Sequence, residues 1–351
     1  MGLGQVFFAL VGGGDVVGYA GDNCLEEKML RPLVTSLLSL MILMGQIWRS
    51  WPDEYTHLVF CDVGQGDATL ITSGFTQMLV DGGRGEEVLS CLEEHMPFWD
   101  RTIELVVATH DDADHIGGLD AVIQQYDVSQ IVSTQFVKDT QTFLEFKEEV
   151  EQEVIAGAVL KKPILGQQMR FTQEEYLLNS IKTYQRPTVV LSTLSPQADQ
   201  VGLAVENSLK TETNLSDSNS IFGSLLAEDF DYNDLSVVLF LQLGQVRVLL
   251  MGDMEREGEL ALINANLLHE ADILKVGHHG AKTSTSTDFL ELVRPETSVI
   301  SVGKNNSYGH PSLEVINSLM QFDSRVLRTD QLGTVEIVSD GEKYWLMEDR
   351  F

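Results

Sequence analysis

The sequence predicts an α+β or α/β domain that begins near residue 57, behind an apolar N-terminal segment over residues 1–50. Three observations support this prediction. Short apolar runs typical of strands alternate with longer segments of helical periodicity. Most of these runs end in a polar or glycine-rich turn. The 351 residues are 43% hydrophobic, which is enough for a substantial core and excludes a disordered or collagen-like protein.

The N-terminal segment contains an uncharged apolar run from Leu33 to Trp48, with basic residues on both sides. The run is slightly shorter than the roughly 20 residues of a typical membrane-spanning helix, and Trp48 and Trp51 would suit the membrane interface. We expect a membrane helix over 33–48 and a membrane-anchored protein, although the flanking charges do not identify the side on which the main domain lies. The alternatives are a buried helix in a soluble cytoplasmic protein and an unusual signal sequence, which begins late for that role.

The elements of the main domain follow in order. Strands are expected at 57–62, 68–72, 77–80 and 105–109, and a helix at 116–126. An acidic insertion covers about 140–235: it starts with a helix at 140–153 and contains a polar loop at 214–220. A hairpin over Gly244 and Gln245 joins strands 236–243 and 246–251. The remaining elements are a strand at 272–276, a helix at 286–293, a strand at 298–302, a helix at 312–320 and closing strands at 325–329 and 333–338.

Charge and cysteine content limit the function classes. The chain has 23 basic and 53 acidic residues, a formal net charge of −30. Such a surface repels phosphate, which argues against a general nucleic-acid coat protein but not against an enzyme that meets DNA only in a cleft. Cys24, Cys61 and Cys91 are odd in number and widely spaced, so we expect no disulfide framework, with Cys61 a buried small hydrophobe.

The strongest chemical signal is the segment from His110 to Gly118, HDDADHIGG, directly after an apolar strand. His110, Asp112 and Asp114 alternate and so project to one side of an extended segment, whereas His115 points elsewhere. The segment therefore offers two half-sites for metal ions, His110 with Asp112 and Asp114 with His115. Glycine at 117 and 118 lets the next helix start close to the cluster.

Two further strands end in metal-binding residue types. Asp253 follows the strand that ends at Met251, and a carboxylate with two oxygens can bridge two cations. His278 and His279 follow the strand at 272–276. Because adjacent side chains point in different directions, we expect one of the two histidines to bind metal and the other to orient a ligand or substrate.

A fourth polar loop, residues 303–311, also follows a strand and contains His310. His310 is a candidate general acid or phosphate contact; the alternative is a turn in which the histidine is incidental. His57, His95 and His269 have no such context, and we interpret them as structural or surface residues.

Taken together, these motifs resemble the metallo-β-lactamase fold superfamily and, within it, the C-terminal domain of ComEC-type DNA-internalisation (competence) proteins. The resemblance covers about residues 57–340. Its motifs are FCDVGQGDA at 60–68, LVDGG at 79–83, HDDADHIGG at 110–118, NDLS at 233–236 before Gly252-Asp253, HHG at 278–280 and YGHP at 308–311. The resemblance implies an αββα four-layer sandwich with metal ions at one edge of its two sheets.

The resemblance also implies a site with two divalent cations. His110, Asp112 and Asp253 would hold one cation, and Asp114, His115, Asp253 and one of His278 and His279 the other. Where the superfamily usually has a second histidine this chain has Asp112, so the site is rich in oxygen and suits Mn²⁺ as well as Zn²⁺. Asp114, Asp253 and His310 are the predicted catalytic residues. Supporting or substrate-binding roles are expected for Asp62, Asp67, Asp81, Asn233, Asp234, Ser236, Lys282, Lys304 and Asn306.

The primary hypothesis is a two-metal phosphodiesterase that acts on single-stranded DNA and is linked to DNA uptake. ComEC-type proteins also carry a multi-helix membrane channel, so we expect a channel partner for this chain. The first alternative is a hydrolase of small phosphoesters, esters or lactams, because a fold does not fix a substrate. A positive groove around Lys275, Lys282 and Lys304 would favour DNA. The second alternative is a non-catalytic assembly module.

Overall fold

The structure, a computed structural model, describes residues 23–134, 138–171, 188–195 and 232–347. The chain divides into two compact units, residues 1–51 and residues 52–351. The first unit contains helix α1 (Asn23–Arg49), and the predicted helix at 33–48 lies within it. By length and composition, its stretch Pro32–Arg49 is long and apolar enough to cross a membrane. Several of its apolar side chains, including Leu38, Met41 and Ile42, are more than half exposed.

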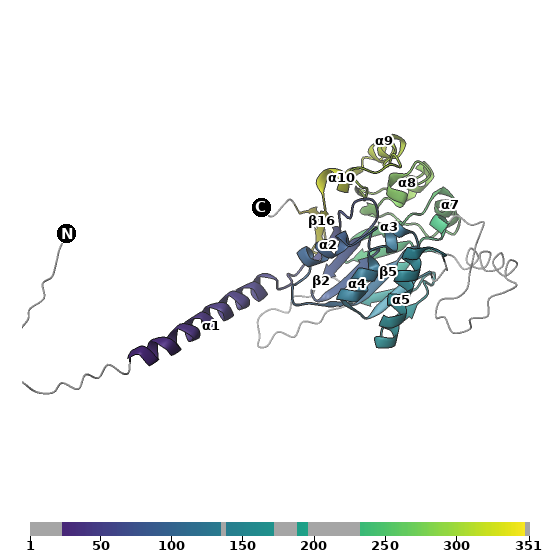
Figure 1. The fold of residues 1–351 in the computed structure, drawn as a ribbon. Helices are drawn as coiled ribbons and strands as arrows, with labels where there is room; N and C mark the ends of the chain where they lie inside the picture. The colour runs from purple at the N-terminus through teal and green to yellow at the C-terminus, as the bar shows by residue number, and fades with distance from the viewer. Residues whose placement is uncertain (1–22, 135–137, 172–187, 196–231, 348–351) are drawn as a thin grey trace, which may run out of the picture. The chain divides into compact units, whose positions relative to one another are not determined.

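The second unit has four layers, with two β-sheets packed face to face and helices on both outer faces (Figure 1). The larger sheet has the strand order β17 (Tyr344–Leu346), β16 (Val335–Ser339), β1 (Thr56–Phe60), β2 (Thr69–Ser73), β3 (Thr76–Val80), β5 (Leu105–Ala108), β7 (Gln130–Ser133) and β8 (Val159–Lys161). The smaller sheet has the order β15 (Arg325–Arg328), β14 (Thr297–Ile300), β13 (Ile273–Lys275), β12 (Val246–Leu250), β11 (Leu239–Leu243), β10 (Val189–Thr193) and β9 (Gln168–Phe171). Strands β4 (Thr102–Ile103) and β6 (Asp127–Val128) form a separate pair.

Each sheet carries its own helices. Those with residues packed against the larger sheet are α2 (Glu87–His95), α3 (Ala113–Ile116), α4 (Leu119–Gln125) and α5 (Gln141–Ala156). Those packed against the smaller sheet are α7 (Arg256–Asn264), α8 (Thr287–Val293) and α9 (Leu313–Gln321). The short elements are η1 (Tyr232–Leu235), η2 (Gly277–Gly280) and α10 (Thr329–Leu332).

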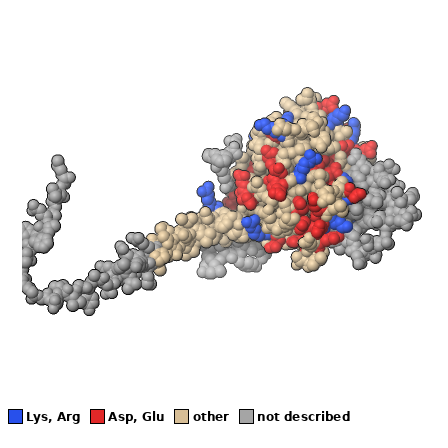
Figure 2. Space-filling model, in the orientation of Figure 1, with Lys and Arg blue, Asp and Glu red and all other residues tan. Residues whose placement is uncertain are grey.

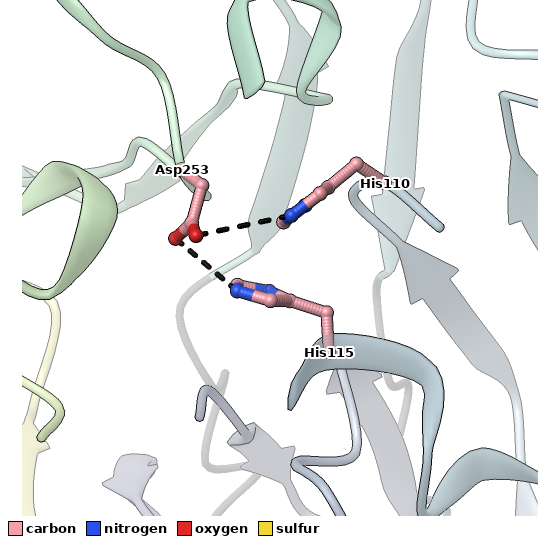
Figure 3. Close-up of side chains that lie close together, drawn as sticks. All are labelled: His110, His115 and Asp253. Carbon is pink, nitrogen blue, oxygen red and sulfur yellow. Dashed lines mark ion pairs between the residues drawn. The ribbon is translucent and has the colours of Figure 1, made fainter. Parts of the chain in front are cut away.

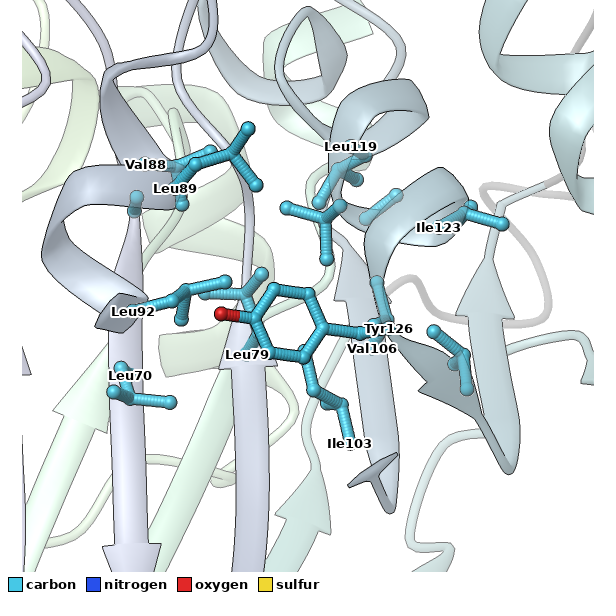
Figure 4. Packing of buried hydrophobic residues seen from close by; sticks show 14 of the residues in the cluster. Leu70, Leu79, Val88, Leu89, Leu92, Ile103, Val106, Leu119, Ile123 and Tyr126 are labelled. Atoms are coloured by element: carbon cyan, nitrogen blue, oxygen red, sulfur yellow. The ribbon is translucent and has the colours of Figure 1, made fainter. Parts of the chain in front are cut away.

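Three apolar clusters hold these layers together. One lies between the sheets and includes Leu58, Val107 and Leu241. The second lies between the larger sheet and its helices, where Leu79, Val106 and Tyr126 pack together (Figure 4). The third lies beneath α7, α8 and α9. The central strands are therefore buried on both faces, which is why β5, with the sequence LVVA, is a continuous apolar run instead of an alternating pattern.

Strand direction explains why the polar motifs meet. β3, β5 and β7 run parallel in the larger sheet, and β12, β13, β14 and β15 run parallel in the smaller one. The carboxyl ends of neighbouring parallel strands lie at the same edge of a sheet, where ligand sites form in open α/β sheets. The loops after β5, β12 and β13 carry the predicted metal ligands, and the loops after β3 and β14 carry Asp81 and His310.

The predicted four-layer αββα sandwich is confirmed, and most predicted strands agree within two or three residues. The helix predicted at 116–126 is two helices, α3 and α4, separated by Gly117 and Gly118. A Cβ at Gly118 would collide with the carbonyl oxygens of Gly82 and Gly85, so the close approach requires glycine. The described parts of the acidic stretch at 140–235 supply α5, β8, β9 and β10 to the layers. The loop predicted at 214–220 lies outside the described residues.

The expectation that the cysteines form no disulfide is wrong. Cys61, just after β1, is bonded to Cys91 on α2, with their Cα atoms 5.9 Å apart. Both residues belong to the cluster between the larger sheet and its helices, and Cys61 is buried as expected. They are separated by 30 positions in the sequence, and only the packing of α2 against the sheet brings them together.

Candidate metal centre

The loop from β5 to α3 supplies four of the predicted ligands. His110 and His115 are buried, with side-chain exposures of 2% and 0%. Asp114 is 20% exposed, and Asp112 is 39% exposed and forms an ion pair with Lys138. The loop thus places two histidines inside the protein and its two carboxylates nearer to solvent.

Asp81, the residue after β3, fixes the orientation of this loop. Its Oδ1 accepts a hydrogen bond from the backbone N–H of Thr109 at 2.8 Å, and its Oδ2 accepts one from the Thr109 hydroxyl at 2.8 Å. The same Oδ2 lies 2.8 Å from Nδ1 of His115. A carboxylate at one ring nitrogen directs the other nitrogen to a ligand, so Asp81 prepares Nε2 of His115 for binding.

Asp253 comes from the other sheet and faces these histidines. Its Oδ1 lies 3.1 Å from Nε2 of His115, and its Oδ2 lies 3.8 Å from Nε2 of His110 (Figure 3). Its backbone N–H donates to the hydroxyl of Ser236 at 3.1 Å, which fixes the turn after β12.

His279 completes the cluster, whereas His278 points toward its rim. His278 and His279 both have left-handed backbone angles, with φ of 45° and 52°, so the chain turns sharply between them. Nδ1 of His279 donates to the carbonyl of Ser301 at 2.9 Å, and its Nε2 lies 3.5 Å from Oδ2 of Asp114 and 3.7 Å from Oδ2 of Asp253. His278 is 24% exposed, with Nδ1 2.6 Å from Glu255 and Nε2 3.9 Å from Asp253.

Several buried side-chain atoms of this cluster lack hydrogen-bond partners among the described residues. They include the Nε2 atoms of His110, His115 and His279 and Oδ1 of Asp253. Leaving a buried polar atom unpaired costs roughly 1–3 kcal/mol, so several converging ones indicate a ligand site. Four groups of atoms within 4.8 Å of one another could each hold a cation, and two of them consist of predicted ligands alone: His110 with His115 and Asp253, and Asp114 with His115 and His279.

Asp67 forms a second buried layer behind the cluster. It is ion-paired with Lys275, and the two side chains are 4% and 3% exposed. Its other oxygen lies 3.4 Å from Nδ1 of His279. Lys275 is therefore unavailable for the positive groove considered from the sequence: it lies in the interior, where it neutralises Asp67.

The other predicted residues divide into structural supports and exposed side chains. Asp234 accepts hydrogen bonds from the backbone N–H groups of Glu255 and Gly258, and so holds the turn after Asp253. Asn233 is half-buried beside it in η1. Asp62 is exposed and accepts a hydrogen bond within its own turn from Gly64.

Lys282 and Lys304 are exposed, and Asn306 organises the loop at 303–311. Its Nδ2 donates to the carbonyls of Gly303 and His310, and its Oδ1 accepts from the backbone N–H groups of Gly309 and His310. The ring centroid of His310 lies 5.5 Å from that of His278, at the rim of the cluster.

The sequence matches the family model of the metallo-beta-lactamase superfamily over residues 61–304, more than half of the chain. The chain belongs to the metallo-β-lactamase superfamily.

Two competence proteins are similar in sequence to this chain. ComE operon protein 3 of Bacillus subtilis (strain 168) is 29% identical over 305 residues, covering 78% of this chain and 32% of that protein. Competence protein ComA of Neisseria gonorrhoeae is 37% identical over 112 residues, covering 31% and 16%. The chain thus spans about a third or less of the length of these relatives. Among solved structures, the metallo-beta-lactamase fold protein YhfI from Bacillus subtilis shares 13% identity with a TM-score of 0.41, covering 80% of this chain and 99% of that one.

The electrostatics of the cluster fit the divalent cations that metallo-β-lactamase proteins bind. Burial and the neighbouring His115 lower the pKa of His110 to about 3, so its imidazole is neutral, as a metal ligand must be. Burial alone would lower the pKa of His115 and raise that of Asp253. Asp253 and Asp81 instead raise the His115 pKa well above its usual value, while His115 and His279 hold the Asp253 pKa well below its usual range. The ionised carboxylates therefore call for positive charge, which a bound cation would supply.

Glu255 is a site residue that the sequence analysis missed. It lies two positions after Asp253 and contacts Nδ1 of His278. Its position gave a signal, because a carboxylate two residues after Asp253 in a turn lies near the same edge of the sheet. Asp111 was also passed over: burial raises its pKa to about 7, and the Thr134 hydroxyl donates to it at 3.2 Å.

Proposed function

We propose that this chain is a metal-dependent phosphodiesterase that cleaves single-stranded DNA during DNA uptake. The observation that carries the proposal is the convergence of unpartnered buried nitrogen and oxygen atoms from both sheets at one edge of the sandwich. The link to DNA uptake is supported by the similarity to competence proteins, one of them named Competence protein ComA.

The proposal includes a ligand assignment, which is supported by the short distances among His115, His279 and Asp253. We assign His110, Asp112 and Asp253 to one cation and Asp114, His115, His279 and Asp253 to the other. His279 is preferred over His278 because its Nε2 is buried beside Asp114 and Asp253. Carboxylates and imidazoles together suit Mn²⁺ or Zn²⁺. When bound, two such cations activate water and neutralise the charge that develops on a phosphate during in-line displacement.

The chain's own residues position the reacting groups. Asp81 and the carbonyl of Ser301 fix the rings of His115 and His279, and Ser236 fixes Asp253. Hydrolysis adds water across a phosphorus–oxygen bond, and the leaving oxygen must take up a proton. We assign His310, at the rim beside His278, to contact with the phosphate and its leaving oxygen.

We further propose that α1 anchors the protein in a membrane and that a separate channel partner delivers the DNA. The apolar stretch Pro32–Arg49 supports the anchor. An accessibility experiment would establish the side of the membrane on which the second unit acts.

The test is hydrolysis of end-labelled single-stranded DNA by the full chain in mild detergent, with Mn²⁺, Zn²⁺ or a chelator. Asp114→Ala should lose activity and one bound cation, measured by elemental analysis. Glu148→Ala removes an exposed carboxylate on α5 and should behave as the unchanged protein does. Retention of both activity and full metal content by Asp114→Ala would contradict the assignment.

The net charge of −30 favours a second candidate, a hydrolase of small phosphoesters, esters or lactams. Acidic side chains form patches over the visible face of the second unit, with Lys and Arg scattered among them (Figure 2). Metal-dependent hydrolysis of p-nitrophenyl esters or a chromogenic lactam, without DNA cleavage, would support it. A chain purified from metal-replete medium without bound metal would instead support an assembly module.

A further inference from the structure

An exposed aromatic side chain stands beside the candidate metal centre. Tyr308 is 58% exposed although it lies in a loop that is otherwise well tied down. Its ring is nearly parallel to that of His310, with an angle of 8° and centroids 5.9 Å apart. His310 lies 5.5 Å from His278, whose Nε2 is 3.9 Å from Asp253. Three rings, Tyr308, His310 and His278, thus form a row from solvent to the cluster.

The loop at 303–311, which carries Tyr308 and His310 of this aromatic row, is held by many hydrogen bonds. The amide of Asn306 makes four hydrogen bonds to backbone groups of the loop. The loop is also tied to the loop after β1, because the backbone N–H of Gly303 donates to the side chain of Gln65 at 3.2 Å. A Cβ at Gly303 would lie 2.7 Å from the backbone nitrogen of Gln65, so the two loops touch. Tyr308 is therefore held in place beside the centre without contributing to the apolar core.

We infer that the aromatic row is a platform on which a base of single-stranded DNA stacks, one step from the bond to be cleaved; this inference rests on the proposed nuclease function. Every nucleobase has a π-face, and stacking on an exposed aromatic ring is the common way in which proteins hold single strands without sequence preference. In duplex DNA the bases are already stacked on one another, so such a platform selects single strands.

Because the protein is acidic, it needs a contact with DNA that does not depend on ionic attraction, and base stacking is such a contact. With a formal net charge of −30, long-range ionic attraction does not draw DNA to the surface. Lys304, in the same loop, and Lys282, just after η2, are exposed cations that suit backbone phosphates on either side of the stacked base. Stacking supplies affinity that does not depend on charge, next to these two local cations.

The experiment compares Tyr308→Ala and Tyr308→Phe with the unchanged full chain in mild detergent. The substrates are a normal oligothymidylate and one of equal length with abasic residues. Tyr308→Ala should raise KM for the normal strand about 5- to 100-fold, the range that one base–aromatic stack supplies. Its kcat and metal content should stay within about twofold, Tyr308→Phe should retain the normal KM, and the abasic strand should show no effect of either substitution. Phe98→Ala removes an aromatic ring elsewhere that is 48% exposed, and it serves as the matched control.

A binding measurement separates this inference from the nuclease proposal. In chelator, where no cleavage occurs, 2-aminopurine in a single strand should lose fluorescence on binding to the unchanged protein and to Tyr308→Phe, but not to Tyr308→Ala. DNA cleavage with the same KM and the same fluorescence change in Tyr308→Ala overturns the platform alone. A wild-type chain that neither binds nor cleaves the strand overturns both proposals.

Discussion

Replacing Lys275 by methionine removes the partner of a buried carboxylate. Lys275 and Asp67 are 3% and 4% exposed and form an ion pair behind the metal-site histidines. Burial alone would raise the pKa of Asp67, but Lys275 and His279 hold it at about 2. Without Lys275 the carboxylate loses its main compensation, while methionine keeps the shape and apolar contacts of the lysine stem.

Removing one member of a buried ion pair costs about 3–5 kcal/mol, because the remaining charge is neither hydrated nor paired. For a unit of this size, about 1 kcal/mol shifts the melting temperature by about 2 °C, so we expect a fall of about 6–10 °C. Asp67→Asn leaves the ammonium group of Lys275 unpaired. It should destabilise the protein less than Lys275→Met does only if that ammonium group reaches water. The double variant, with two neutral side chains of similar shape, should recover much of the loss.

Thermal unfolding of the full chain in chelator measures these effects without a contribution from bound metal. The two single variants and the double variant form a double-mutant cycle, and the coupling free energy should exceed about 2 kcal/mol. Additive losses of less than about 1 kcal/mol each would refute the reasoning, because they would mean that water reaches the pair and screens it.

Three further predictions concern other parts of the second unit. Burial alone would lower the pKa of His57, but hydrogen bonds to Asp53 and Glu336 raise this pKa from 6.5 to about 9. The contribution of His57 to stability is therefore complete below pH 6.5 and is lost as the pH rises through about 9. His57→Gln should thus lower stability by about 2 kcal/mol near pH 6, after allowance for solvent screening, and by almost nothing near pH 10, as measured by denaturant unfolding at each pH. Asn306→Ala removes the amide that organises the loop at 303–311 and should lower kcat/KM on single-stranded DNA about tenfold or more, with only a small change in melting temperature; an unchanged kcat/KM would mean that the loop holds its shape without it. Reduction of the disulfide between Cys61 and Cys91, which closes a loop with a sequence separation of 30, should destabilise the unit by about 3–4 kcal/mol, and alkylation with intact-mass measurement should show two more free thiols only after reduction.

The motif residues could be predicted from the sequence because each of them directly follows a strand. His110, Asp253 and His279 each follow a strand within a parallel group, and their contacts show that the carboxyl ends of both groups lie at the same edge of the sandwich. Asp81 follows the same rule, and its expected supporting role agrees with its contacts to Thr109 and His115.

Other features depend on packing that leaves no local signature. Nothing in the sequence separates His278 from His279, since the choice depends on the left-handed turn between them. Lysine is a residue type usually found at the surface. Only the position of Asp67 on a neighbouring loop shows that Lys275 is buried. The pairing of Cys61 with Cys91 likewise depends on how α2 lies on the sheet.

The candidate centre draws its side chains from both sheets, with consequences for assembly. His110 and His115 follow a strand of the larger sheet, whereas Asp253 and His279 follow strands of the smaller one, more than a hundred residues later. The group His110, His115 and Asp253 and the group Asp114, His115 and His279 each need residues from both halves, so a chain under synthesis completes neither group until the second sheet has docked. A cation with ligands from both sheets would stabilise the packing of one sheet on the other. Each tenfold rise in its free concentration above Kd would add about 1.4 kcal/mol to the free energy of unfolding.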